Sequence, residues 1–254
     1  VAPVRGNNYI NLYAIAFTLN DGCMKHFAAI LACLCLALVV SATVVAYDDV
    51  EGAGFVVNPI LTQHGIVFTD NYSSALYLSS GDNVRTLTSS PGCGSYYSVS
   101  PNRNSIGFKL IDENGMQSPA IIDLESKAVI QLHDGVERAG QVSFTNDGRY
   151  ALTIGTTLFI LRGKESATYD LGVYSNLAPV SPDGNLVAYN DNNDQLLVMN
   201  LSTREKSIIT DSKRGYCSPQ WASTSSMLLY SSLNGIVSVR DIASRKTYDI
   251  GGGI

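Results

Sequence analysis

Few side chains in this sequence are of the types, and at the spacings, that carry out chemistry. His64 and His133 are the only histidines after residue 46. His64 falls in an expected turn and His133 at the end of an expected outer strand, where we expect solvated rather than catalytic imidazoles. The Gly-x-Ser-x-Gly turn of serine hydrolases does not occur. The sequence also lacks a CxxC motif and any Cys/His cluster with metal-ligand spacing. We therefore predict no catalytic residue, no cofactor and no metal site.

A run of oxygen-bearing side chains, Asp191-Asn192-Asn193-Asp194, contains the kind of ligands that a calcium loop uses. The same run forms a tight connection between two expected strands, and Asn and Asp are the usual residues in such turns. We predict a turn at this position.

Three aromatic residues are the candidates for binding a ligand: Tyr96, Tyr97 and Trp221. Each stands at the start of an expected inner strand, and such strands line the central channel if the sheets close into a ring. The alternative is that these rings pack between neighbouring sheets. Channel-mouth binding is the functional interpretation.

The overall charge argues against a nucleic-acid partner. The net charge is −5, only 15% of the residues are charged, and no block of Lys or Arg occurs. Binding to phosphates requires clustered positive charge. We therefore expect no nucleic-acid binding.

An export signal is predicted at residues 24–46. Met24-Lys25-His26 precedes an apolar run over residues 27–45, and small residues up to Ala46 suit cleavage. The alternative is a membrane anchor over 27–46, because the run approaches the length that spans a bilayer. Residues 1–23 begin without Met, and we interpret them as an over-extended or non-native N-terminus. Residues 47–57 would form a short N-terminal segment of the mature chain.

Two cysteines, Cys93 and Cys217, follow the expected cleavage point. An oxidising compartment permits a disulfide between them. They lie near the starts of the second and fifth repeats described below, which favours two separate buried thiols.

Residues 58–254 contain a degenerate repeat of about 40 residues. The clearest copy has a strand, a Ser-Pro-Asp-Gly turn at 181–184, a second strand, a polar turn and two more strands. Aligning the copies by their turns makes the second-strand residues Phe68, Phe108, Thr153, Tyr189 and Tyr230 equivalent. A 40-residue unit of four strands is typical of a propeller blade. The sequence predicts an all-β propeller of four-stranded blades, with five repeats visible.

The repeat resembles the WD40-like repeats of TolB-type propellers. Pro219-Gln220-Trp221 and Ser181-Pro182-Asp183-Gly184 each match part of that family's motif, although no copy carries the whole of it. The resemblance implies six blades. The five visible repeats therefore belong either to a five-bladed ring or to an incomplete six-bladed one, and we expect that the chain is cut short after Ile254.

The resemblance implies an exported, non-catalytic propeller that acts as a protein-interaction platform in the periplasm or cell envelope. Its partner would be an envelope protein or peptide, and it would touch a membrane only through residues 27–46. The alternative is the N-terminal propeller of a longer exported hydrolase, either a peptidase or a cell-wall hydrolase, whose catalytic domain is missing here.

Overall fold

The computed structural model describes residues 56–210, 218–232 and 235–251. The expected signal segment, the stretch before it and most of residues 47–57 lie outside this part, and so does Cys217. Those predictions therefore stay as expectations. Among the described residues, no helix is long and apolar enough to cross a membrane.

Five antiparallel sheets follow one another along the compact unit Val45–Ile254. The first contains β1 (Val57–Thr62), β2 (Gly65–Thr69), β3 (Ala75–Ser80) and β4 (Asn83–Ser89). The second contains β5 (Ser98–Val99), β6 (Ser105–Ile111), β7 (Gln117–Asp123) and β8 (Val129–Gln131). The third contains β9 (Ser143–Phe144), β10 (Tyr150–Ile154), β11 (Thr157–Arg162) and β12 (Glu165–Asp170). The fourth contains β13 (Leu186–Asn190), β14 (Leu196–Asn200) and β15 (Lys206–Ile208). The fifth contains β16 (Gln220–Trp221), β17 (Met227–Ser231), β18 (Val237–Asp241) and β19 (Thr247–Gly251).

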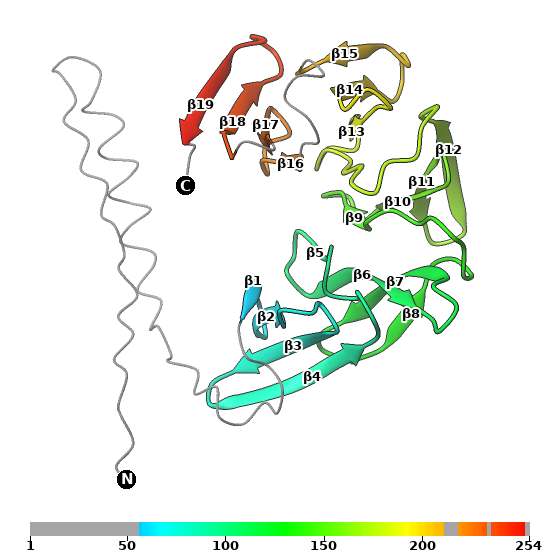
Figure 1. Ribbon diagram of the computed structural model, residues 1–254, viewed down its shortest axis with the longest axis vertical. Helices are drawn as coiled ribbons and strands as arrows, with labels where there is room; N and C mark the ends of the chain where they lie inside the picture. The colour runs from blue at the N-terminus through cyan, green and yellow to red at the C-terminus, as the bar shows by residue number, and fades with distance from the viewer. Residues whose placement is uncertain (1–55, 211–217, 233–234, 252–254) are drawn as a thin grey trace, which may run out of the picture. The chain divides into compact units, whose positions relative to one another are not determined.

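The sheets form the five blades of a β-propeller, which confirms the predicted fold class. In Figure 1, the first strands β1, β5, β9 and β16 lie toward the centre and the last strands lie at the periphery. Blade 4 differs from the others because its inner strand is reduced to a single bridge between Val180 and Val187.

Apolar side chains on both faces of the middle strands seal the junctions between blades. Blades 1 and 2 share a buried cluster that includes Val67, Leu78, Ile106 and Phe108. Equivalent clusters join blade 3 to blade 4 and blade 4 to blade 5. Burial on both faces explains why β14 is an unbroken apolar run instead of an alternating one.

One junction depends on the absence of a side chain. A Cβ atom added to Gly107 in blade 2 would lie 2.7 Å from the Cβ of Val142, at the start of blade 3. Because that distance is too short for two carbon atoms, only glycine lets the two blades approach this closely.

The turn between the first and second strands is one residue shorter in blade 3 than in its neighbours. The amide of Ser181 donates to the carbonyl of Leu186, five residues on, whereas the amide of Thr145 donates to that of Arg149, four residues on. Leu152 is therefore the equivalent of Tyr189, and the sequence-based alignment of Thr153 with Tyr189 was wrong by one position. A shift of one residue moves a strand side chain to the opposite face.

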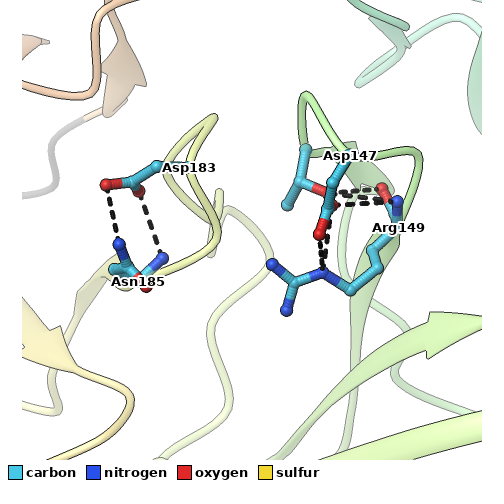
Figure 2. A network of polar contacts seen from close by, with 5 residues as sticks. Asp147, Arg149, Asp183 and Asn185 are labelled. Carbon is cyan, nitrogen blue, oxygen red and sulfur yellow. Dashed lines mark hydrogen bonds and ion pairs between the residues drawn. The ribbon is translucent and has the colours of Figure 1, made fainter.

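Figure 2 shows these turns in blades 3 and 4. The carboxylate of Asp147 accepts from Arg149 Nε at 2.8 Å, and the carboxylate of Asp183 accepts from Asn185 Nδ2 at 2.9 Å. Hydrogen bonds from Arg149 and Thr145 lower the pKa of Asp147 to about 2. Both aspartates are turn residues, and the turn that contains Asp183 is the one that the sequence predicted at 181–184.

The face of blade 5 that points away from blade 4 is less sealed than the equivalent faces of the other blades. Val67, Ala151 and Ala188 are completely buried on those faces, whereas Leu229 in the same position is half-buried. Val239, which pairs with Leu229, is also half-buried.

Candidate functional site

The chain segments that enter the five blades line one central cavity of about 520 Å³. Each blade contributes through its inner strand or the residues just before it: 58–60, 95–98, 141 and 143, 177 and 179, and 218–220. Residues up to about 160 positions apart in the chain therefore meet at one place, the mouth of the propeller channel.

The described lining of this cavity is uncharged, and its polar groups are hydroxyls, amides and backbone groups. Tyr96 is its most available aromatic side chain, with 41% of its surface exposed. Gln141 is held in place, because its Nε2 donates to the carbonyl of Tyr97 at 3.2 Å and its backbone amide donates to the carbonyl of Asn176 at 2.7 Å. Gln220, from blade 5, also lines the cavity and is exposed. Such a surface is suited to hydrogen bonding with a neutral, extended segment.

Tyr97 lines the same cavity but is buried. Its hydroxyl donates to the backbone carbonyl of Asn58, which ties blade 2 to blade 1. Burial raises the pKa of the Tyr97 phenol well above its usual range. Tyr97 therefore holds the wall of the cavity, and Tyr96 beside it is the ring that a ligand can reach.

Trp221 lies one residue beyond Gln220 and turns toward the junction between blades 4 and 5. Its indole N–H donates to the carbonyl of Pro179 at 2.9 Å. The ring packs against the cluster formed by Leu196, Leu228 and their neighbours. In this position Trp221 fixes the rim segment that carries Gln220.

A buried lysine contacts Asn176, which precedes the cavity-lining Leu177, and the sequence reasoning missed it. Lys109 has only 6% of its surface exposed. Its ammonium donates to Gln117 Oε1 at 3.1 Å, to the carbonyl of Ala139 at 2.9 Å and to Asn176 Oδ1 at 2.8 Å. These contacts join blade 2 to the segments that enter blades 3 and 4. Desolvation lowers the pKa of Lys109 to about 8.

One sequence signal pointed to this lysine. Lys109 interrupts the apolar run of β6 that begins at Ile106, and a charge within such a run needs buried acceptors. The structurally equivalent position in blade 3 is Thr153, whose hydroxyl donates to the carbonyl of Ser175 at 2.9 Å. This strand position therefore places a polar group against the segment that enters a later blade.

The histidines and the acidic run make other contacts. His64 Nε2 and Asn104 Oδ1 are 2.5 Å apart, which joins the turns of blades 1 and 2. His133 Nδ1 is 2.8 Å from the carbonyl of Asp134. The carboxylate of Asp191 accepts from the backbone amides of Asn193 at 2.8 Å and Gln195 at 2.9 Å, which is a turn geometry.

Cys93 is a buried free thiol in the junction between blades 1 and 2. Burial is the main cause that raises its pKa, so the neutral thiol is favoured.

Comparison with solved structures confirms the predicted resemblance at the level of the fold. The crystal structure of TolB from Acinetobacter baumannii matches with a TM-score of 0.60 at 18% identity, over 76% of this chain and 53% of that one. A protein of Agrobacterium tumefaciens assigned as TolB matches with a TM-score of 0.61 at 12% identity, over 78% of this chain and 80% of that one. The chain thus spans about half the length of the Acinetobacter protein. No family model matches the sequence. No curated protein matches it either.

Proposed function

We propose that this chain is an exported, non-catalytic propeller of the cell envelope that binds a segment of a partner protein at its channel mouth. The observation that carries the proposal is the cavity of about 520 Å³, to which all five blades contribute. Its volume lies in the range of about 300–1,000 Å³ that is usual for ligand sites.

The chemistry of the lining supports a peptide segment as the occupant. A peptide offers a backbone donor and acceptor at each residue, and these can pair with the amide of Gln220 and the exposed hydroxyl of Ser95. The exposed ring of Tyr96 provides an apolar face beside them. The export part of the proposal rests on the signal-like pattern at residues 24–46.

Site-specific photo-cross-linking in the native host cell tests the binding site. A photoreactive phenylalanine at position 96 should give one discrete adduct, because this side chain reaches into the cavity. The matched control is the same replacement at Tyr72, which is 84% exposed in a loop of blade 1 and should give no such adduct. The adduct should also disappear when Gln141 and Gln220 are both changed to alanine, since those side chains shape the mouth.

Identical adducts at positions 96 and 72, or an adduct that survives the double alanine change, would refute binding at the mouth. Export is tested separately by sequencing the N-terminus of the chain isolated from the envelope fraction. A start near Tyr47 supports cleavage, and a cytoplasmic chain that retains residues 24–46 would refute export.

A further inference from the structure

A second concavity lies at the outer part of the junction between blades 4 and 5, away from the channel mouth. It has a volume of about 420 Å³. Its apolar lining consists mainly of Leu186, Val198, Ile209 and Ile242, all of which belong to or pack against the cluster between these blades. Two arginines, Arg240 and Arg245, also line it. We call this concavity the rim groove.

The rim groove exists because this junction lacks two contacts that occupy the same place between blades 3 and 4. There, the guanidinium of Arg204 lies over the ring of Tyr169, 4.4 Å from its centroid. The repeat makes Arg245 the equivalent of Arg204, since both follow the same turn with a positive φ. The strand pairings make Ile209 the equivalent of Tyr169. Isoleucine is smaller and has no aromatic face, so the space stays open and Arg245 lacks a ring to stack on.

The second contact comes from Lys206, whose ammonium donates to the carbonyl of Leu171 across the junction between blades 3 and 4 at 3.1 Å. Its equivalent in blade 5 is Thr247, which is too short to reach across. Thr247 instead accepts a hydrogen bond from Arg240 Nη1 at 3.0 Å within its own blade.

Arg240 occupies a position that other blades fill with buried apolar side chains. It pairs with Leu228, just as Met199 pairs with Val187 in blade 4 and Ile122 pairs with Ile106 in blade 2. Met199 and Ile122 are buried, whereas Arg240 is half-buried and borders the rim groove. A guanidinium therefore stands where the repeat predicts a core residue.

Neither arginine of the rim groove forms an ion pair with a residue that the structure describes. Within the described part of the chain, the ion pair that forms is the one between Arg149 and Asp147. Glu205 also lines the groove, and its carboxylate accepts from the hydroxyl of Thr203 at 3.3 Å in the adjoining turn. The groove thus combines an apolar floor with two guanidiniums that form no ion pair with a carboxylate of the described residues.

We propose that the rim groove binds a single-chain anionic amphiphile. Its acidic head, a carboxylate or a phosphate, is held by Arg240 and Arg245, and its apolar chain lies on Ile209, Ile242 and their neighbours. Guanidinium forks match the two oxygens of either head, and burial of the chain removes apolar surface from water. This site is separate from the channel mouth and does not depend on the function proposed for it.

The protein contains its own reporter for this site. Trp221 is the only tryptophan in the chain, and it packs against the same cluster as Leu186, Ile209 and Ile242. The full chain is titrated with dodecanoate, dodecyl phosphate and dodecyl maltoside, each below its critical micelle concentration, while tryptophan emission is recorded. We expect saturable changes with the two anionic probes and none with the neutral maltoside. The ratio of the two anionic affinities assigns the preferred head.

Two variants and a matched control complete the test. Arg240→Met restores the residue of blade 4 and should fold at least as well as the wild type, so a loss of binding cannot be attributed to unfolding. Arg240→Met combined with Arg245→Gln should weaken dodecanoate binding at least tenfold. Arg162→Gln, at an exposed arginine of blade 3, should leave it unchanged. Equal binding of the maltoside, or unchanged dodecanoate affinity in the double variant, would overturn the proposal.

Discussion

Replacing Lys109 by methionine tests how a buried ammonium group affects the pH dependence of folding. In the folded protein the pKa of Lys109 is about 8, against about 10.4 for a lysine in an unfolded chain. Below pH 8 both states carry the proton. Between pH 8 and pH 10 the unfolded chain binds more protons than the folded one, so the free energy of unfolding rises with pH in this range.

The size of the effect follows from the two pKa values. Linkage gives a gain of roughly 1.3 kcal/mol in the free energy of unfolding between pH 7 and pH 9. Lys109→Met removes this gain, since methionine does not titrate. The variant should also be less stable at every pH, because Gln117, Ala139 and Asn176 lose their common donor. That second loss does not depend on pH, so the slope isolates the titration.

Other groups limit the useful pH range. The pKa values of Tyr97 and Tyr174 are raised by burial, and that of Cys93 is raised as well, so these groups reduce stability as pH rises above the ordinary pKa of each. Tyr174 also contacts the acceptors of Lys109, and Arg138 lies over its ring. Measurements should therefore stop at pH 9, where the phenols are still protonated in both states, and the effect of Cys93, which titrates in the unfolded chain at about pH 8.5, cancels because the wild type and the variant share it.

The assay is urea denaturation followed by circular dichroism at pH 7, 8 and 9. The wild type should gain stability relative to Lys109→Met by about 1.3 kcal/mol across this range. Lys164→Met, at an exposed lysine in a turn of blade 3, is the matched control and should follow the wild type. If the free energies of unfolding of the wild type and Lys109→Met change in parallel with pH, the inference that burial lowers the pKa of Lys109 is wrong.

Three further predictions concern the turns and the last junction. Arg149→Gln should raise the pKa of Asp147 from about 2 toward its ordinary value, which carboxyl NMR titration would detect; stability at pH 2–4 should then be lost at a higher pH than in the wild type. Gly184→Ala and Gly148→Ala should each lower the free energy of unfolding by about 1–2 kcal/mol in chemical denaturation, because both positions have positive φ. Only Gly184→Ala should also raise the pKa of Asp147, since its new Cβ would lie 2.1 Å from Arg149 Nη2 and displace that side chain. Trp221→Phe should cost about 1–2 kcal/mol in the same assay, because a carbonyl of blade 4 loses its indole donor; an unchanged midpoint would contradict that contact.

The repeated turns were the most informative part of the sequence. The Ser-Pro-Asp-Gly turn, with Gly184 at positive φ and the carboxylate of Asp183 bonded to Asn185, forms from neighbouring residues alone. Turns of this kind can be predicted from the sequence, because the residues that form them are adjacent in the chain. It predicted the all-β class, the meander order of the strands and the five blades, all of which the structure shows.

The register of blade 3 was not readable in the same way. Its turn is shortened by one residue between Thr145 and Arg149, and no residue type marks the deletion. Thr153 therefore seemed equivalent to Tyr189, although it lies on the opposite face of its sheet. The hydrogen bond from the Thr145 amide to the Arg149 carbonyl and the pairing of Tyr150 with Phe144 reveal the shift.

The sequence offered Tyr96, Tyr97 and Trp221 as candidates for binding at the channel mouth. The structure places Tyr96 and Tyr97 in the lining of one cavity and Trp221 in the junction between blades 4 and 5. The sequence did not separate the exposed ring of Tyr96 from the buried ring of Tyr97, because both have the same local context. Their different roles depend on Asn58, which lies 39 residues away in another blade.

The sequence by itself determined the blades, since each one is built from turns and short strands within about 40 residues. The tertiary structure decided what lies between the blades: the buried Lys109, the tightly packed Gly107 and the open rim groove beside Arg240. Each of those features is produced by side chains from two or more blades that meet only when the ring forms. Whether such a space is filled, charged or empty depends on the sizes and charges of side chains that are far apart in the chain. A local sequence pattern cannot predict how these side chains fit together.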